Sequence, residues 1–153
     1  MGTACLENSG SFKSATSARD AKTPNDIIRA LANAFLKGPF TDEERVRHAQ
    51  LMIREMIRPS LALDMLVAEV MVPFFGELAG LLGPFMREGI QKDRLMLNII
   101  TVFSMVTYFN FARAPVMRVT GEEYDDVFKD RLVDHIVQFS LTGLPLDSEE
   151  GVG

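Results

Sequence analysis

The sequence has few of the residues that mark secreted, metal-binding or nucleic-acid-binding proteins. Its one cysteine, Cys5, excludes an internal disulfide and a cysteine-based metal cluster. The net charge is -5 and no basic run is present, which argues against binding of nucleic-acid phosphates by this chain alone. With 11 glycines and 7 prolines, the chain is neither fibrous nor wholly disordered. Its 153 residues, 47% of them hydrophobic, predict one domain with a single core.

The chain also lacks the apolar segment of a secretory signal within residues 1–22, which favours the cytoplasm. This segment is rich in Ser, Ala, Thr and Gly without a period, and predicts a disordered N-terminal tail. Residues 145–153 predict a second, acidic tail. The domain itself is expected over residues 23–144.

No catalytic or metal-binding motif is found in the sequence. HExxH, GxSxG, GxxxxGK[ST] and GxGxxG are all absent, and the two histidines, His48 and His135, stand far apart. Gly76 and Gly80 lie on a predicted helix, where close helix packing is the better interpretation. We therefore expect no metal site, no cofactor and no enzymatic activity.

Hydrophobic periodicity predicts an all-α fold of five helices and no sheet. The first is capped by Thr23, the second by a Thr41–Glu44 capping box and the third by Ser60. Pro73 should kink the third helix near the carbonyl of Glu69. The second helix is expected to turn five apolar side chains inward: Val46, Ala49, Met52, Ile53 and Met56. In the same helix, Arg54 or Glu55 should be buried or lie at a rim.

The last two predicted helices are joined by a short connector. Residues 115–119 form that connector, and a capping box of Thr120 and Glu123 should begin the final helix. That helix should end at Gly143 in a left-handed turn.

The fourth helix contains the longest uncharged stretch, residues 95–112. One face is apolar, with Ile99, Val102 and Val106, and the other is polar, with Asn98, Thr101, Ser104 and Tyr108. Such a helix is a central helix, an intersubunit helix or a membrane span. The polar side chains favour the first two, because they would be costly against lipid. The polar face then either lines a cavity or pairs across a dimer interface.

Three segments resemble the C-terminal regulatory domain of the TetR family of bacterial transcription regulators, nearest the CecR-like subgroup. They are HAQLMIREMIRPSLALDMLVAEVMVPFF (48–75), VFSMVTYFNFARAPVMRVTG (102–121) and YDDVFKDRLVDHIVQFSLTGL (124–144). The REM-x-x-PS junction and the closing HIVQFSLTGL are the most specific parts, and the resemblance covers about residues 23–144.

The resemblance implies an all-α, five-helix regulatory domain that binds a small apolar or amphipathic effector and forms a homodimer. Residues 93–113 and 121–142 would supply the two helices that pair with their copies in a four-helix bundle. By helix position, the effector-pocket candidates are Phe35, Met52, Met71, Phe75, Thr101 and Tyr108. The dimer-interface candidates on the two bundle helices are Val106, Phe109, Phe128, Leu132, Ile136 and Phe139.

The sequence departs from that family by showing no helix-turn-helix before the domain, so a truncated regulator or a stand-alone sensor is expected. This chain alone should not bind specific DNA, although a heterodimer with a full-length relative remains an alternative. A helical carrier or enzyme for a small apolar molecule is the other alternative, with Glu55, His48 or Tyr108 as its candidate acid or base.

Overall fold

The computed structural model describes residues 23–148 and is all-α over that range. The predicted tail of residues 1–22 and the last part of the predicted C-terminal tail, residues 149–153, lie outside the described residues. The elements are α2 (Pro24–Leu36), α3 (Asp42–Ile57), α4 (Leu61–Leu66), the π-helix η2 (Val67–Met71), α5 (Val72–Leu82), the 3-10 helix η3 (Gly83–Phe85), α6 (Lys92–Phe111), α7 (Arg113–Thr120) and α8 (Asp126–Gly143). Residues Leu61–Phe85 form one continuous rod, so the described chain has six helices rather than the expected five.

Capping hydrogen bonds confirm three of the predicted helix starts. The Thr23 hydroxyl accepts a hydrogen bond from the amide of Asp26 at 3.2 Å. Thr41 and Glu44 form a complete capping box, in which each side chain accepts from the other residue's amide. The Ser60 hydroxyl accepts from the amide of Ala62 at 3.2 Å. Each cap satisfies a donor that the first helical turn leaves without a backbone partner.

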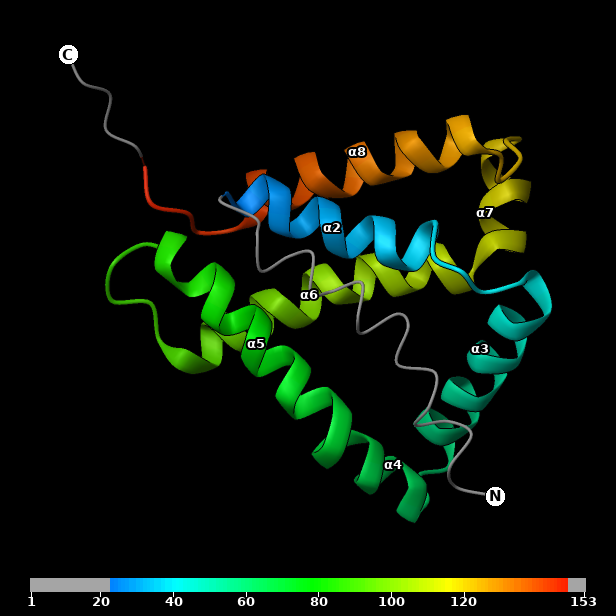
Figure 1. Ribbon diagram of the computed structural model, residues 1–153, viewed down its shortest axis with the longest axis horizontal. Helices are drawn as coiled ribbons and strands as arrows, with labels where there is room; N and C mark the ends of the chain where they lie inside the picture. Colours follow the sequence, from blue (N-terminus) through cyan, green and yellow to red (C-terminus); the bar gives the residue numbers. More distant parts are fainter. Residues whose placement is uncertain (1–22, 149–153) are drawn as a thin grey trace.

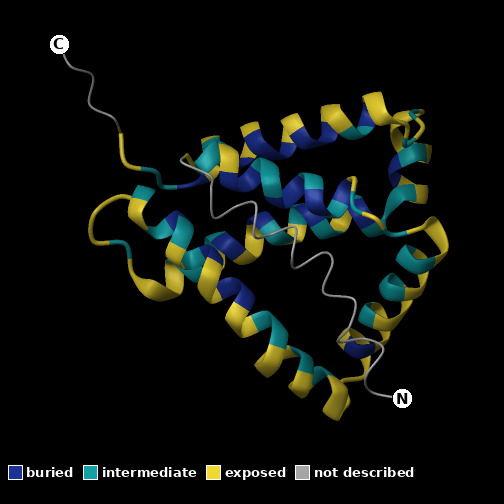
Figure 2. Ribbon diagram, in the orientation of Figure 1, coloured by how far each residue is buried: buried dark blue, intermediate teal, exposed yellow. Residues whose placement is uncertain are grey.

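The core lies where α2, α6 and α8 run side by side (Figure 1) and where α5 crosses them. Figure 2 shows the buried residues concentrated on the facing sides of these helices. The most deeply buried large side chains are Ile27, Ile28, Leu36, Leu82, Ile99, Val106, Val133, Ile136 and Val137. The apolar face of α6 that the sequence predicts, with Ile99, Val102 and Val106, is therefore confirmed as a core face.

The sixth helix is α7, which occupies the segment expected to be a connector. Thr120 does not begin the final helix, because it is the last residue of α7 and its hydroxyl donates to the carbonyl of Val116 at 2.8 Å. Gly121 ends α7 with a φ of 74°, a left-handed conformation that glycine adopts without steric cost. The cap of α8 is Asp125, whose carboxylate accepts from the amide of Phe128 at 2.8 Å.

The end of α8 also differs from the expectation. Gly143 is the last helical residue, and the chain leaves it through Leu144 in an extended conformation rather than through a left-handed turn. Residues 145–147 then pair with residues 85–87, because the amide of Arg87 donates to the carbonyl of Pro145 and that of Asp147 donates to the carbonyl of Phe85. This part of the expected tail is held against the body of the domain.

The rod Leu61–Phe85 is π-helical just before Pro73. The amide of Val72 donates to the carbonyl of Val67, five residues back, in place of the usual four. Pro73 has no N–H for the carbonyl of Glu69, and the wider π turn is the local response to that missing donor. The close packing expected at Gly76 and Gly80 is not found in the described chain, because a Cβ at either position would meet nothing within 4 Å.

Helix α3 is far less buried than its apolar pattern predicts. Val46, Ile53 and Met56 are exposed by 56%, 55% and 71%, so the expectation that they point inward is wrong for this chain by itself. Periodicity identifies an apolar face but not what covers it. The expectation for Glu55 is confirmed, since it is buried and its carboxylate accepts from the amide and the hydroxyl of Ser60 at 3.0 and 2.8 Å.

Two helices are long and apolar enough to cross a membrane by length and composition, Leu61–Phe85 and Lys92–Phe111. The core helices of water-soluble proteins meet the same test. In this structure one face of α6 packs against α2, α5 and α8, and 22% of the apolar window of each of the two helices is buried.

The Glu55–Ser60 contact explains the physical role of the REM-x-x-PS junction and can be tested directly. Replacing Glu55 with alanine leaves the amide and hydroxyl of Ser60 without their acceptor, and should lower the free energy of unfolding by about 1–2 kcal/mol. Urea denaturation followed by circular dichroism measures this change. The exposed Glu88 serves as the control, since Glu88→Ala should leave the midpoint in place. Equal effects of the two substitutions would contradict a structural role for the junction.

Candidate functional site

Helices α3, α4–α5 and α6 form three sides of a triangle in Figure 1. Half-buried apolar side chains lie on two of these elements, with Met52 on α3 and Leu63, Leu66 and Met71 on the long rod. Methionine and leucine side chains of this kind adapt to apolar ligands of different shape. Two of the predicted effector-site residues, Met52 and Met71, are among these side chains.

Two of the predicted pocket residues, Phe35 and Phe75, meet at a third aromatic ring. The ring of Phe103 on α6 lies 5.6 Å from that of Phe35 and 5.1 Å from that of Phe75, in edge-to-face arrangements. Phe74 completes the group at 5.6 Å from Phe103. We name these four residues the phenylalanine cluster. Phe103 was missed in the sequence, although its place beside the apolar face of α6 was the available signal.

The remaining predicted pocket residues divide between two sides of α6. Met71 packs against the core cluster, and Met52 is half-buried on α3. Thr101 and Tyr108 are exposed, on the face of α6 opposite its buried residues. The Thr101 hydroxyl donates to the carbonyl of Leu97 at 2.8 Å, within its own helix. The structure thus does not bring Thr101 and Tyr108 together with the phenylalanine cluster.

The predicted dimer-interface residues also separate into two groups. Four of them belong to the core of the single chain, with exposures of 6% or less: Val106, Phe128, Leu132 and Ile136. A second chain cannot reach these side chains in this arrangement. Phe139 is exposed by 60%, and Phe109 is half-buried beside it.

An aromatic strip crosses from α6 to α8 around these two residues. The ring of Tyr108 lies 6.0 Å from that of Phe109, Phe109 lies 6.1 Å from His135, and His135 lies 5.9 Å from Phe139. Tyr108 and Phe139 are exposed by 58% and 60%. We name these four residues the aromatic seam. His135 belongs to it, and so does Tyr108, which the sequence had predicted in the effector pocket.

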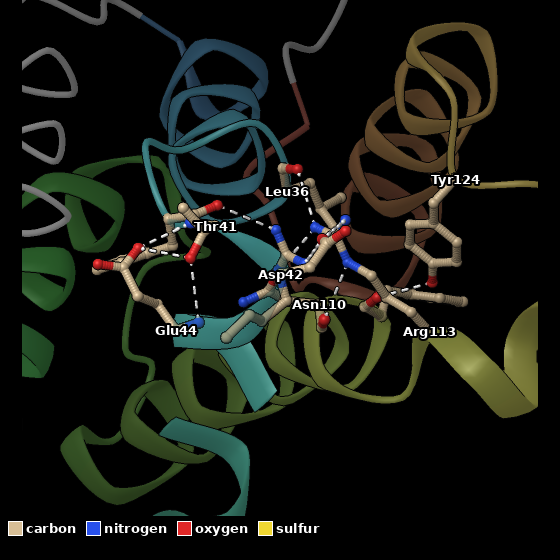
Figure 3. A network of polar contacts seen from close by, with 10 residues as sticks. Leu36, Thr41, Asp42, Glu44, Asn110, Arg113 and Tyr124 are labelled. Carbon is tan, nitrogen blue, oxygen red and sulfur yellow. Dashed lines mark hydrogen bonds and ion pairs between the residues drawn. The ribbon is translucent and has the colours of Figure 1, made fainter. Parts of the chain in front are cut away.

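A second feature, a polar network centred on Arg113, joins the ends of four helices (Figure 3). The Arg113 guanidinium donates to the carbonyl of Leu36 at 3.2 Å and to both the carbonyl and the side-chain oxygen of Asn110 at 3.2 Å. Its carbon atom Cζ lies 4.8 Å from the ring centre of Tyr124, a cation–π distance. The Tyr124 hydroxyl donates to the carbonyl of Phe109 at 2.7 Å.

Burial and neighbouring charges shift the pKa values of Asp42, Arg113 and Tyr124 in this network. The hydrogen bond and charge of Arg45 lower the pKa of Asp42, and Arg113, whose nitrogen lies 3.9 Å away, lowers it further. Burial lowers the pKa of Arg113 and raises that of Tyr124. Since Asp42 is almost fully exposed, its ion pairs are screened by water, and the buried hydrogen bonds of Arg113 hold the network together.

A cavity of about 630 Å³ opens beside this network. It is lined by Leu36, Lys37, Gly38, Phe40, Thr41, Asp42, Arg45, Asp126 and Lys129. None of the predicted pocket residues is among them. Among the lining residues Arg45 pairs with Asp42, and Lys37 pairs with Asp130 outside the lining, so the cavity has a mixed-charge surface.

The residues proposed as an acid or base for an enzyme do not converge. Glu55 is engaged with Ser60, His48 packs its ring 5.0 Å from that of Phe40, and Tyr108 lies on the aromatic seam. Within the described residues, no group of three or more histidine, cysteine, aspartate or glutamate side chains is placed to hold a metal ion.

A comparison with protein-family models gives a match to this chain. The family model for the C-terminal domain of the HTH-type transcriptional dual regulator CecR matches residues 24–144. The chain belongs to this family. No curated protein and no solved structure matches it. The resemblance to TetR-family C-terminal domains seen in the sequence is thereby confirmed, and the CecR family is one of regulator domains.

Membership of the CecR family also bears on the two long apolar helices. Both lie within the matched region, which is a transcription-regulator domain. The family therefore favours the interpretation of α6 as a central or intersubunit helix over that of a membrane span.

The Arg113 network predicts that arginine cannot be replaced there by another cation. Lysine keeps the charge but cannot donate to the Leu36 and Asn110 oxygens at once while lying over Tyr124. Arg113→Lys should therefore lower the free energy of unfolding by about 2 kcal/mol, measured by urea denaturation. Arg118→Lys, an exposed position of the same helix α7, is the matched control and should change it by less than about 0.5 kcal/mol. Similar values for both would show that charge alone matters.

Proposed function

We propose that residues 24–144 are the effector-binding and dimerisation domain of a TetR-like transcription regulator. The match to the CecR family over nearly the whole described chain is the observation that carries this proposal. Its output would pass through a helix-turn-helix on the same polypeptide or on a partner, including a full-length relative in a heterodimer. An effector changes DNA affinity only if it binds two conformations of the regulator unequally.

The dimer interface is proposed to lie on the exposed sides of α6 and α8. There the aromatic seam is accompanied on α6 by Leu97, 64% exposed, and by Ile100, 39% exposed. Exposed aromatic side chains grouped on adjacent helices are typical of interface centres. The side-chain nitrogen of Asn98, which lies on the seam's side of α6 by helical spacing, is buried with no acceptor in the described chain.

An arginine in the aromatic seam should separate the subunits without unfolding them. Phe139→Arg and Tyr108→Arg introduce a charge that the free subunit can expose to water but a packed interface cannot. Light scattering should report twice the 17.0 kDa of one chain for the wild type and a single chain for both variants. Val119→Arg, at a position 86% exposed on α7, should remain a dimer. By contrast Ile136→Arg, which is fully buried, should fail to fold.

A monomeric wild-type protein, or a Phe139→Arg variant that remains a dimer, would contradict the proposed interface. The circular dichroism of each variant distinguishes loss of association from loss of folding.

The effector is proposed to bind among α3, the rod α4–α5 and α6, above the phenylalanine cluster. Met52 on α3 and Met71 on the rod are both half-buried and would supply an apolar, sulfur-containing lining. An apolar or amphipathic small molecule suits such a lining, because the driving force is the burial of apolar surface. Phe35 and Phe75 would contact it through the shared cluster, whereas Thr101 and Tyr108 belong to the dimer side.

A fluorescent apolar probe tests this site without knowledge of the natural effector. N-phenyl-1-naphthylamine should increase in fluorescence on binding the wild-type protein. Met52→Glu places a charge beside the apolar lining and should weaken binding at least about fivefold. Gln50→Glu adds the same charge to an exposed position of α3 and should leave the affinity unchanged. Equal affinities of both variants would place the probe elsewhere.

A further inference from the structure

The rod Leu61–Phe85 has two halves that differ sharply in burial. In the described chain, no residue from Leu61 to Met71 is buried. In the second half, Phe74, Phe75, Leu78 and Leu82 are all buried in the core. The first half therefore extends beyond the core as an overhang, as the exposed far end of the rod in Figure 2 shows.

The change in burial coincides with a weak point in the backbone. Across η2 the amide of Val72 bonds five residues back, and the amide of Val67 is shared between the carbonyls of Leu63 and Asp64. Pro73 then supplies no amide hydrogen at all. A π segment and a proline are the usual causes of helix bending, and here they are adjacent. Bending at this point disturbs few regular hydrogen bonds.

The overhang is joined firmly to α3 and weakly to the rest of the molecule. Glu55 near the end of α3 accepts from both the amide and the hydroxyl of Ser60, and these bonds fix the corner between α3 and α4. Glu55 is itself the one buried residue of α3 in the described chain. Along the rest of α3 and α4, little apolar area holds the corner in place, so its displacement costs little hydrophobic free energy.

The other end of this corner has a second pivot. Helix α3 begins after Gly38 and Pro39, and it meets the body of the domain through packing against α6 and through Asp42, an exposed residue 3.9 Å from Arg113. An exposed ion pair at that distance contributes little stability. Both attachments of the corner thus allow rotation, while the corner itself is rigid.

We propose that α3 and α4 form one rigid arm that swings about the π-helical segment Val67–Met71 and regulates access to the phenylalanine cluster. This inference rests on the proposed function, because the arm carries Met52 and flanks the proposed effector site. Swinging of the arm changes the distance between α3 and the cluster while α2, α6 and α8 stay packed. The arm is the element with two arrangements that effector binding selects between.

Hydrogen exchange of the full chain without any ligand tests the arm. The amides of residues 46–57 and 62–66 should open together and show similar protection, at least about tenfold below that of residues 76–82 and of α2. Pro73→Ala restores a donor for the Glu69 carbonyl and should raise protection in both parts of the arm together, by about threefold or more. Pro84→Ala, in η3 of the same rod, is the matched control and should leave the arm unchanged.

A second variant tests whether the arm is one body. Glu55→Gln weakens the corner and should make the protection of α3 and α4 differ, while that of α5 is unchanged. Protection of residues 62–66 equal to that of 76–82 in the wild type would overturn the proposal. An increase in protection by Pro73→Ala that is confined to the residues beside position 73 would also overturn it. If Pro73→Ala does not fold, the protection pattern of the wild-type protein and that of Glu55→Gln test the proposal.

The outcome is separable from that of the proposed function. Hydrogen exchange is measured without an effector. High protection of the arm in the wild-type protein would therefore refute the swinging arm but would not affect the proposals on probe binding and dimerisation. If the wild-type protein fails to bind the probe while its arm shows the expected low protection, the effector site is refuted instead.

Discussion

The uncharged helix α6 has to be covered by other helices, and this requirement governs how they pack. Eighteen consecutive residues without a charge, from Leu95 to Ala112, need neighbours on every side. Helices α2, α5 and α8 cover one side, where Ile99, Val102 and Val106 are almost fully buried. The other side still exposes Leu97 and Tyr108. In the proposed dimer, a second subunit packed on the exposed side would complete the coverage.

The domain divides into a packed body and a loosely attached arm. In the body, α2, α6 and α8 share most of the buried side chains, and Arg113 links the ends of these helices through carbonyl oxygens and the ring of Tyr124 (Figure 3). In the proposed arm, α3 and α4 are joined to each other at Glu55 and Ser60. In the proposed sensor, the rigid body would preserve the dimer while the softer arm would respond to ligand.

Local chemistry made much of the fold predictable from the sequence. The caps at Thr23, Thr41 and Ser60 were predicted because a hydroxyl before a helix has one nearby amide to accept from. The disturbance at Pro73 was predicted because proline lacks a donor. The end of the chain was less predictable, since Thr120 with Glu123 and Asp125 with Phe128 offer competing helix starts only a few residues apart. Because α7 takes up Thr120 and is capped by Gly121, the final helix begins after Asp125.

Residue spacing within single segments was enough to predict every helix of the described chain except α7, together with the apolar faces and the family. The packing of the helices assigned each face to its neighbours. Val106 and Ile136 are buried in the core of one chain, whereas Phe139 is exposed. Tyr108 lies in the aromatic seam and not in the predicted pocket. The packing also left the apolar face of α3 largely uncovered, where periodicity alone suggested burial. The physical reason is that an apolar face specifies burial, whereas its partner is fixed by how distant helices pack together.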